Sequence, residues 1–370
     1  MNLHVSHDNV FMDYVISISD EVDKDNNRFV ILGYDESNML KYIKSKNAAL
    51  YKYDSLEFWN AIGDINTYKN IYIHWLEGLT VDFVLRLPKS VNIIWCFWGG
   101  DGLEIPSLRL RIYQEKTLEY FLKNQNRHES LIENLKSLYR KRRTTRKHLQ
   151  AIRRVNYFAH YLSEDYELIR NDTGMTARFI PFHYASVEDI VSIKEEPGVK
   201  SNDIILGNSD TLSNNHLEAI DYLSALNLSD TRIYCPLSYE KKEYAQFIAS
   251  YGAKALGRNF IPLLEFMPKA DYDSLLSSVN VAIMNHNRSQ ALGNIMVLLW
   301  KGARIYMSKK SSIYNLLLEK GCKIFCLDDL REVDISSPLS KAEVEMNRKI
   351  LLDLFSRENQ KKKFQSLLSI

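Results

Sequence analysis

Short apolar runs alternate with segments of helical periodicity along almost the whole chain. In the first half the apolar runs predict β-strands at Phe29–Leu32, Ile71–Ile73, Val91–Phe97, Val155–Phe158 and Arg178–Phe182. The intervening pattern predicts helices, which include Leu56–Ile62 and Leu108–Leu122. Strands that alternate with helices are typical of a parallel sheet with crossover helices.

The second half repeats this pattern. It predicts strands at Asp203–Leu206, Arg232–Cys235, Val279–Met284, Arg304–Met307 and Lys323–Leu327. It predicts helices at Asn215–Leu226, Glu240–Tyr251, Leu292–Lys301 and Ile313–Lys320, and further helix from about Lys341 onwards. Two such blocks indicate two Rossmann-like domains. The turn-forming Glu195-Glu196-Pro197-Gly198 places their boundary within Ala185–Ser201. We therefore predict domains at 1–185 and 186–370, the second with terminal helices.

Composition is that of a soluble globular protein. Of 370 residues, 45% are hydrophobic and 25% charged, and the net charge of +2 says little about partners. Three of the four cysteines lie in apolar runs, which fits buried thiols in a reducing compartment. The amino terminus lacks a signal-peptide pattern, and no stretch is apolar enough to span a membrane. These features favour a cytoplasmic protein and leave contact with a membrane surface open.

One segment, 136–154, is strongly basic. No Asp or Glu occurs between Asn134 and Ser163, while Lys and Arg are frequent. The basic residues are Lys136, Arg140, Lys141, Arg142, Arg143, Arg146, Lys147, Arg153 and Arg154. The segment is compatible with a solvated helix face or with a patch for anionic lipid headgroups or a lipid diphosphate. Nucleic-acid binding is the weakest alternative, because no nucleic-acid motif accompanies the charge.

A strand-to-helix turn in the second half has the composition of an anion site. The run Ile204-Ile205-Leu206 leads into Gly207-Asn208-Ser209, and Asn215 and Glu218 have the spacing of a helix-capping pair. Backbone N–H groups at such a helix start bind phosphates. The alternative is that Gly207 only makes the turn and Ser213 only caps the helix. A full G-x-G-x-x-G is absent, so we expect no dinucleotide cofactor, and indeed no cofactor.

A second polar loop, His286–Asn294, follows the predicted strand Val279–Met284. Loops at the carboxyl edge of an α/β sheet bind ligands. Arg288 could neutralise a departing phosphate, and Gly293 could let the backbone approach it closely. An exposed arginine on an ordinary loop is the alternative.

Two further motifs could carry proton chemistry. In Trp98-Gly99-Gly100-Asp101, the carboxylate of Asp101 follows an apolar strand and could take a proton from a hydroxyl. A turn aspartate that bonds its own backbone is the alternative. His7 and His74 are possible bases or structural histidines. Asp271-Tyr272-Asp273 opens a helical pattern, so we interpret Asp271 as a helix cap and expect no metal site.

Together these motifs resemble the bacterial TDP-N-acetylfucosamine:lipid II N-acetylfucosaminyltransferases, also called 4-alpha-L-fucosyltransferases (glycosyltransferase family 56). The resemblance runs from about His4 to Leu327. It is carried by Trp98-Gly99-Gly100-Asp101, Leu206–Ser209 through Ser213-Asn214 to His216, Pro236-Leu237-Ser238-Tyr239, Arg288-Ser289-Gln290 with Gly293, and the His7, Asn9 and His74 matches.

The resemblance implies an α/β fold of the GT-B class, in which two facing Rossmann-like domains enclose a cleft. It implies an inverting, metal-independent transfer of a fucosamine-type sugar from a TDP-sugar to an undecaprenyl-diphosphate-linked saccharide. Enterobacterial common antigen is made in this way at the cytoplasmic face of the inner membrane. The protein would then be a peripheral membrane protein, and its basic segment would lie beside the acceptor lipid.

The resemblance also assigns roles to residues. The donor nucleotide would contact Gly207, Asn208, Ser209, Pro236, Tyr239, Glu265, Met267, Gln290, Gly293 and Asn294. Arg288 would stabilise the leaving diphosphate, and Asp101 would act as the base, with His7 as the second candidate.

Departures from the family pattern leave the substrates open. Gly100 stands at the third position of the Trp-Gly-x-Asp motif, and Asn294 follows Gly293 where a small hydroxyl residue can occur. A UDP- or GDP-sugar and a capsule or O-antigen pathway are therefore alternatives. From other classes, a non-catalytic nucleotide- or glycan-binding protein is the main alternative, and an NAD-dependent epimerase is disfavoured because its motifs are missing.

Overall fold

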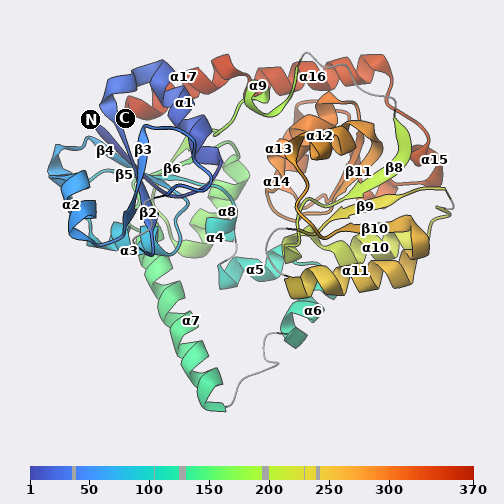
Figure 1. Ribbon diagram of the computed structural model, residues 1–370, viewed down its shortest axis with the longest axis horizontal. Helices are drawn as coiled ribbons and strands as arrows, with labels where there is room; N and C mark the ends of the chain where they lie inside the picture. Colours follow the sequence, from blue (N-terminus) through green and yellow to red (C-terminus); the bar gives the residue numbers. More distant parts are fainter. Residues whose placement is uncertain (36–38, 104, 125–130, 194–199, 229, 239–241) are drawn as a thin grey trace. The chain divides into compact units, whose positions relative to one another are not determined.

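The computed structural model describes residues 1–35, 39–103, 105–124, 131–193, 200–228, 230–238 and 242–370, with only the backbone for 131–139. The chain forms two compact units. Unit 1 comprises Met1–Leu108, Glu129–Asp189 and Phe355–Ile370, and unit 2 comprises Arg109–His128 and Ile190–Leu354. Each unit is built around one parallel β-sheet (Figure 1).

The sheet of unit 1 has the strand order β3-β2-β1-β4-β5-β6-β7. The strands are β1 (Asn2–His7), β2 (Asn27–Gly33), β3 (Ala48–Lys52), β4 (Asn70–His74), β5 (Ile93–Cys96), β6 (Tyr157–His160) and β7 (Arg178–Pro181). The order reverses between β1 and β4, which is the switch point where α/β sheets bind ligands.

Helices cover both faces of this sheet. They are α1 (Phe11–Asp23), α2 (Leu56–Ile62), α3 (Leu79–Arg86), α4 (Gly100–Leu103), α7 (Leu131–Ile152), α8 (Ser163–Thr173), α9 (Val187–Ile190) and α17 (Arg357–Leu368). One buried cluster gathers Leu3, Val5 and Trp95, and the other gathers Met12 and Phe364. Because both faces are covered, strands such as Ile93–Cys96 are continuously apolar and were recognisable in the sequence, whereas the central β1 alternates polar with apolar residues and was not.

The sheet of unit 2 has the order β10-β9-β8-β11-β12-β13. Its strands are β8 (Ser201–Leu206), β9 (Ile233–Pro236), β10 (Phe260–Leu263), β11 (Val279–Met284), β12 (Arg304–Met307) and β13 (Phe325–Cys326). The helices of this part of the chain are α5 (Pro106–Ile112), α6 (Glu115–Asn124), α10 (His216–Ser224), α11 (Lys242–Leu256), α12 (Lys269–Ser278), α13 (Leu292–Trp300), α14 (Ser312–Glu319), α15 (Glu332–Ile335) and α16 (Lys341–Phe355). The switch point here lies between β8 and β11.

The predicted parallel sheets are confirmed, whereas one predicted helix is wrong. Leu108–Leu122 is not continuous, because the chain breaks at Tyr113 and Gln114 between α5 and α6. The backbone N–H of Gln114 donates to Asn215 Oδ1 (2.9 Å), and its side chain bonds Asn285, so Gln114 cannot continue a helix. The first strand, Asn2–His7, and the edge strands β3 and β10 were not among the predicted runs.

The units differ in detail from a single division near residue 185. The chain enters the longest segment of unit 2 after Asp189, and the turn residues Glu195–Gly198 lie outside the described residues. Segment 109–128 belongs to unit 2 and segment 355–370 to unit 1. The second assignment has a clear physical basis, because α17 packs against α1 and its Phe364 is completely buried in the core of unit 1.

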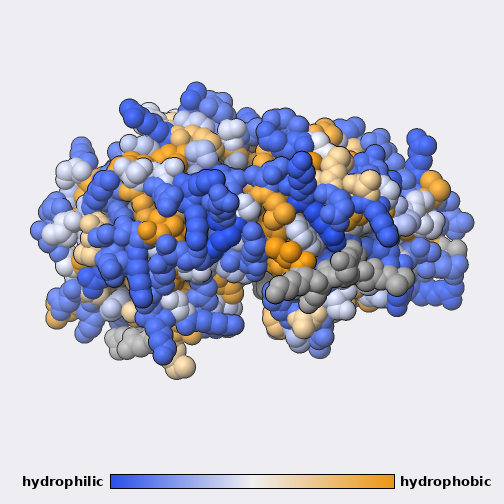
Figure 2. Space-filling view, turned by 90° about the horizontal axis from the view of Figure 1, so that it is seen from above, coloured by the Kyte–Doolittle hydropathy of each residue, from blue (hydrophilic) through white to orange (hydrophobic). Residues whose placement is uncertain are grey.

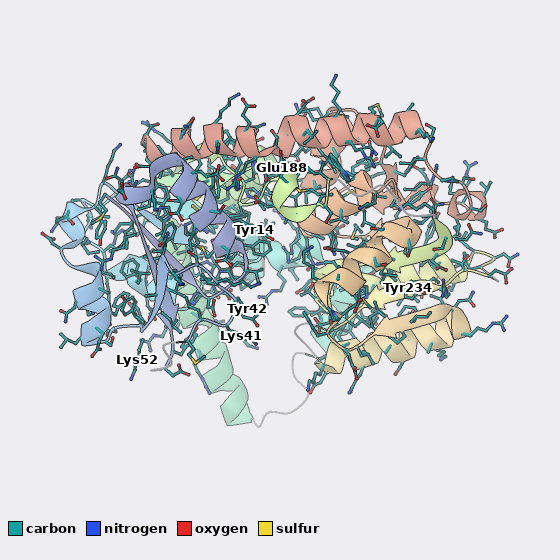
Figure 3. All side chains as sticks on the ribbon, turned by 45° about the horizontal axis from the view of Figure 1, so that its top comes forward. Tyr14, Lys41, Tyr42, Lys52, Glu188 and Tyr234 are labelled. Atoms are coloured by element: carbon teal, nitrogen blue, oxygen red, sulfur yellow. The ribbon has the colours of Figure 1, made fainter. Side chains whose placement is uncertain are left out.

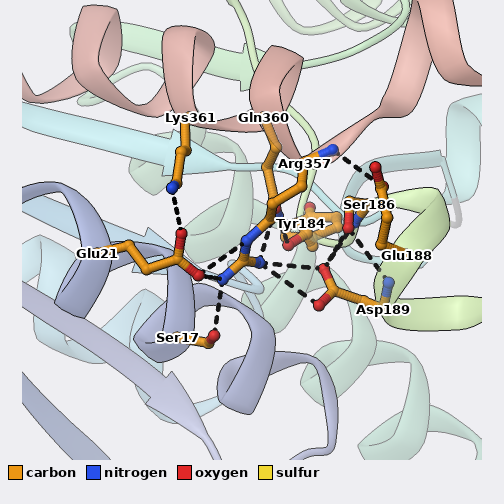
Figure 4. A network of polar contacts seen from close by, with 9 residues as sticks. All are labelled: Ser17, Glu21, Tyr184, Ser186, Glu188, Asp189, Arg357, Gln360 and Lys361. Carbon is orange, nitrogen blue, oxygen red and sulfur yellow. Dashed lines mark hydrogen bonds and ion pairs between the residues drawn. The ribbon is translucent and has the colours of Figure 1, made fainter.

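Arg357 fastens the start of α17 to unit 1 (Figure 4). Its guanidinium donates to Ser17 Oγ (2.7 Å), Asp189 Oδ2 (3.2 Å) and the carboxylate of Glu21. Arg357 and, more weakly, Lys361 hold the pKa of Glu21 below its usual range. The side chains of Arg357 and Asp189 are each only 18% exposed, so this cluster is more than a solvated surface pair.

Arg357→Ala is expected to destabilise unit 1 by about 2 kcal/mol, because Asp189 loses its ion pair and Glu21 keeps only its pair with Lys361. Thermal unfolding followed by circular dichroism should show the loss as a lower Tm. Lys362→Ala on the same helix is the matched control. Lys362 pairs with Glu358 where both side chains are at least 70% exposed, so its loss should change stability by less than about 0.5 kcal/mol. Equal effects of the two substitutions would contradict this view of the cluster.

A second set of contacts orders the segment that precedes β3. The carboxylate of Asp8 accepts the backbone N–H groups of Lys41, Tyr42 and Ile43. Asp13 does the same for Lys44 and Ser45. Figure 3 labels Lys41 and Tyr42 of this segment and Tyr14 of α1. Asp8, directly after β1, and Asp13, in the first turn of α1, therefore hold this segment at the carboxyl end of β1.

Candidate functional site

The loops that follow β8 and β11 meet at the switch point of unit 2. β8 and β11 are neighbours, and their carboxyl ends carry Gly207 and Asn285 respectively. Gly207 N donates to Ile283 O (2.9 Å), which continues the ladder one residue beyond β8. The two polar loops identified in the sequence are therefore brought together.

Gly207 is required by its backbone and by its surroundings. Its φ is +71°, in the left-handed region that favours glycine. A Cβ atom there would lie 2.7 Å from Asn214 Oδ1 and 2.8 Å from His216 Nε2. The turn after β8 thus fits tightly over two buried polar side chains.

Gly207→Ala is expected to lower the free energy of unfolding by about 2–4 kcal/mol, since strain at positive φ adds to a clash in a packed region. Chemical denaturation provides the measurement. Gly257→Ala is the matched control in the same unit: its φ is +60°, but nothing lies within 4 Å of the added Cβ. The free energy of unfolding of this control should fall by only about 1 kcal/mol, the cost of an alanine at positive φ without a clash. A Gly207→Ala variant as stable as the control would refute the packing argument.

Asn214 and His286 hold the turn in place. Asn214 Nδ2 donates to Ser209 O (3.0 Å), so its Oδ1 is the acceptor for Asn208 N (3.0 Å) and His286 Nε2 (2.9 Å). His286 Nε2 therefore carries the proton. Burial lowers the pKa of His286 well below its ordinary value, and the charge of Arg288 lowers it further, so the ring is neutral.

Gln290 joins the two loops. Its Nε2 donates to Asn208 Oδ1 (3.0 Å), and its Oε1 accepts from Ser213 Oγ (2.6 Å). Asn208 Oδ1 also lies 3.1 Å from His286 Nε2. With its oxygen occupied by these donors, Asn208 retains its amide N–H groups for a ligand.

The start of α13 completes this arrangement. Its N-cap, Ala291, has φ +62° and supplies no side-chain acceptor for the first N–H groups of the helix. A Cβ at Gly293 would make an ordinary contact with Ile190 at 3.8 Å and none closer, so Gly293 is not forced by crowding. Arg288, which is 9% exposed, adds a positive charge at the same sheet edge. N–H groups, a helix amino end and a guanidinium make this a candidate anion site. The Asn294 side chain turns to Tyr272 Oη (2.9 Å).

Two predicted caps are wrong. The side chains of Asn215 and Glu218 do not cap α10. Asn215 Nδ2 donates to Asn285 O (3.0 Å), while Glu218 accepts from Thr117 N (2.8 Å) and thereby fastens α6 to unit 2. Asp271 is not a cap either, because α12 begins two residues earlier, after Pro268.

The residues predicted to border the nucleoside follow the neighbouring strands β9 and β10. Pro236 ends β9 and pairs with Leu263 of β10. Glu265 is exposed and Met267 is half-buried, both just beyond β10. Tyr239 lies outside the described residues. The three described residues are thus at the same sheet edge as the candidate anion site.

Asp101 occupies the corresponding edge of unit 1, but its carboxylate is completely buried in α4. It accepts from Leu76 N (2.9 Å), Trp95 Nε1 (2.7 Å) and Trp98 N (3.1 Å). Burial raises the pKa of Asp101, and these hydrogen bonds oppose the shift. The contacts are those of a residue that positions the loops after β4 and β5.

His7 ends β1 at the same edge and is half-buried. Its Nε2 lies 3.0 Å from Glu77 O. Burial lowers the pKa of His7, and contacts with the carbonyl groups of Glu77 and Leu32 oppose this shift. The structure thus places both residues predicted as bases at one sheet edge of unit 1.

The basic segment forms the carboxyl-terminal part of α7 and the turn after it. Lys147 pairs with Asp82, and Arg153 and Arg154 donate to backbone carbonyls of unit 1. The exposed basic side chains are Arg140, Lys141, Arg142, Arg143 and Arg146. The side chain of Lys136 is not among those described.

Neither a metal cluster nor a membrane span is found in the described part of the chain. No group of three or more His, Cys, Asp or Glu is placed there to hold a metal ion. No described helix is both long and apolar enough to cross a bilayer. The face shown in Figure 2 is mainly hydrophilic and carries only small hydrophobic patches.

Solved structures of glycosyltransferases share this fold. Sucrose-phosphate synthase from Thermosynechococcus elongatus is 9% identical, with a TM-score of 0.66 over 100% of this chain and 98% of that one. The OtsA apo structure is 11% identical (TM-score 0.61, 100% and 98% covered). An alpha,alpha-trehalose-phosphate synthase (UDP-forming) from Burkholderia xenovorans is 9% identical (TM-score 0.58, 100% and 99% covered). The two Rossmann-like units therefore define a glycosyltransferase fold of the GT-B class.

The family follows from the sequence match. The model of the 4-alpha-L-fucosyltransferases, glycosyl transferase group 56, matches residues 128–369. The chain belongs to this family and is a glycosyltransferase, as its motifs predicted.

Sequence reasoning missed some organisers of the candidate site. Asn214 and His286 were part of the quoted motifs without a role, and His4 was not singled out. A polar residue within an apolar strand, such as His4 between Leu3 and Val5, was the available signal.

Proposed function

We propose that this protein transfers a fucosamine-type sugar, 4-acetamido-4,6-dideoxygalactose, from a TDP-sugar to an undecaprenyl-diphosphate-linked saccharide. The observation that supports a nucleotide-sugar donor is the uncapped amino end of α13, which follows Arg288 in the loop after β11 at the switch point of unit 2. Family membership supports the sugar class. The product would serve enterobacterial common antigen or a related surface polysaccharide. A UDP- or GDP-sugar for a capsule or O-antigen is the alternative donor.

In the proposed reaction, an acceptor hydroxyl displaces the nucleoside diphosphate in one step and inverts the anomeric carbon. The new C–O bond forms as the bond to the phosphate oxygen breaks, and the hydroxyl proton passes to a base. Arg288, the Asn208 amide and the N–H groups near Gly293 would hold the growing charge on the leaving phosphate. This arrangement needs no metal ion for charge neutralisation.

Two residues of unit 1 are candidates for the base. The buried Asp101 has its carboxylate occupied by three N–H donors, which favours a positioning role. His7 is more exposed and lies at the same sheet edge, so it is the better candidate for direct contact with the hydroxyl.

The test of the proposed function is a transfer reaction with purified protein. TDP-, UDP- and GDP-linked sugars are offered with a polyprenyl-diphosphate-linked saccharide, with and without EDTA. Transfer from the TDP-sugar at a rate that EDTA does not change, with inversion of the anomeric configuration, would support the proposal. Preference for another nucleotide would support the alternative donor. Nucleotide binding without transfer would favour a non-catalytic binding protein.

We also propose that the exposed arginines of α7 bring the protein to the cytoplasmic face of the inner membrane. Each Lys or Arg near an anionic surface contributes about 1 kcal/mol. Changing Arg140, Arg142 and Arg143 to Glu should therefore weaken binding to anionic vesicles by at least about 100-fold in a sedimentation assay. Changing Lys24, Arg28 and Lys89, which are exposed elsewhere on unit 1, alters the net charge equally and is the control. Equal losses in both variants would reject a specific role for α7.

A further inference from the structure

A line of polar side chains runs through the buried core of unit 1. His4 of β1 and His74 of β4 point to the same face of the sheet as Tyr72, and all three are completely buried. The ring of His4 stacks on Tyr72 (centroids 4.5 Å apart) and on Phe29 (4.6 Å). Such polar groups cost free energy in a core unless their hydrogen bonds are satisfied.

The hydrogen bonds along this line fix where each proton lies. Asn27 Nδ2 donates to Asp23 O (2.7 Å), so Asn27 Oδ1 is the acceptor for His4 Nε2 (3.1 Å). His4 Nε2 therefore carries the proton, and His4 Nδ1 has the lone pair. His4 Nδ1 lies 3.0 Å from His74 Nε2, which must then be the donor.

Both rings carry only one proton. Burial lowers the pKa of His4 to about 4 and that of His74 well below its ordinary value. Since the proton of His74 is on Nε2, its Nδ1 has a lone pair and can only accept a hydrogen bond.

His74 Nδ1 and Trp98 Nε1 are both buried, and neither has a hydrogen-bond partner among the described residues. The ring centroids of His74 and Trp98 are 6.4 Å apart. One atom is an acceptor and the other a donor. A hydroxyl group is both at once, so a single hydroxyl between them would satisfy both atoms.

The pair lies where a ligand would approach unit 1. His74 ends β4 beside the switch point, and Trp98 follows β5. Trp98 is partly exposed, and it meets the ring of Phe11 edge-on at 5.6 Å. Phe11 is itself 43% exposed, so the indole of Trp98 packs against a side chain that reaches the surface.

We propose that His74 and Trp98 form a hydroxyl-binding pair that orients one hydroxyl of the acceptor saccharide. Trp98 Nε1–H donates to the hydroxyl oxygen, and the hydroxyl proton is donated to His74 Nδ1. Asn27 and His4 act as positioning residues that keep the lone pair of His74 directed at the ligand. The assignment of the ligand as acceptor saccharide rests on the proposed function.

Substitutions can remove each half of the pair. His74→Gln keeps a donor near the Nε2 position for His4 but removes the Nδ1 acceptor, and Trp98→Phe removes the donor. His74→Asn keeps an acceptor near the Nδ1 position. Tyr72→Phe is the control, because it removes a polar group in the same buried cluster, where the Tyr72 hydroxyl donates to Leu367 O (2.9 Å).

The experiment measures the Kd of the polyprenyl-diphosphate-linked saccharide by calorimetry, which does not depend on turnover. We expect His74→Gln and Trp98→Phe each to raise this Kd by about tenfold. The double variant should bind little more weakly than either single variant, because both groups bind the same hydroxyl. His74→Asn and Tyr72→Phe should bind nearly as the parent protein does.

Unchanged saccharide binding in Trp98→Phe, or no saccharide binding by the parent protein, would overturn the proposal. In the first case the pair would hold only a buried water. If His74→Gln does not fold, Trp98→Phe still decides. TDP binding is measured in the same samples: its absence would refute the proposed donor, whereas intact TDP binding with unchanged saccharide affinity would refute only the hydroxyl-binding pair.

Discussion

Arg288→Ala is expected to lower kcat by about 100- to 1,000-fold, the usual cost of removing one preorganised group that stabilises developing charge. Arg288 is 9% exposed and follows β11 at the switch point, close to the amino end of α13. Its guanidinium would meet the leaving diphosphate where little water screens the charge. Steady-state transfer assays at saturating donor and acceptor provide the measurement.

Two variants make this result specific. Arg288→Lys keeps the charge but loses the planar fork, so it should retain more activity than alanine and less than arginine. Lys309→Ala removes an exposed cation that follows β12 and pairs with Asp328, and its kcat should be nearly unchanged. An Arg288→Ala enzyme with more than a third of the parent kcat would contradict the assigned role.

Acid is expected to unfold the protein well before its carboxylates are protonated. Burial lowers the pKa of His4 to about 4 and those of His183 and His216 to about 3. As the pH falls below 6.5, the unfolded chain binds protons that the folded chain does not. The contribution of these three histidines to the free energy of unfolding is therefore complete above pH 6.5 and is lost as the pH falls towards 4. Each histidine contributes up to about 1.4 kcal/mol to the free energy of unfolding per unit of its pKa shift, so the three together contribute several kcal/mol.

Thermal unfolding at pH 7.5, 6.5, 5.5 and 4.5 measures this dependence. The Tm should change little between pH 7.5 and 6.5 and fall steeply below. His216→Asn removes one of the titrating groups and keeps an oxygen near the Tyr244 hydroxyl, so the Tm of this variant should fall less steeply. A Tm that is constant from pH 6.5 to 4.5 would show that these histidines are accessible to protons in the folded protein.

The sheets were predictable where a strand buried on both faces is also apolar along its length, which β1, with its polar Asn2, His4 and Ser6, is not. Val279–Met284 is apolar at five of six positions and buried throughout, and its ends were predicted correctly. The edge strand Ala48–Lys52 has only its first residue buried, so its pattern was too weak to recognise. Phe260–Leu263, an edge strand of the sheet in unit 2, was missed for the same reason, because only its first residue is buried.

The polar motifs were predictable as positions at a sheet edge but not as contacts. The sequence placed Gly207 and Arg288 after strands, and the structure brings their loops together through Gln290 and Asn214. Asn215 and Glu218 have the spacing of a local cap, yet both bind a segment about 100 residues away. Local spacing cannot reveal such long-range partners, because the same side chains can form a local helix cap or a hydrogen bond to a distant segment.

Calorimetry of TDP with the parent protein and with Gly293→Val tests the central claim, that α13 begins a donor-nucleotide site. A Cβ at Gly293 would make only an ordinary contact with Ile190 at 3.8 Å, so the branched side chain of valine adds bulk at the start of α13, where the proposed phosphate would bind. We predict that the parent protein binds TDP with or without EDTA, that Gly293→Val binds at least about 30-fold more weakly, and that Gly257→Ala binds normally. Failure of the parent protein to bind TDP, UDP or GDP, or equal TDP affinity in Gly293→Val, would contradict the claim.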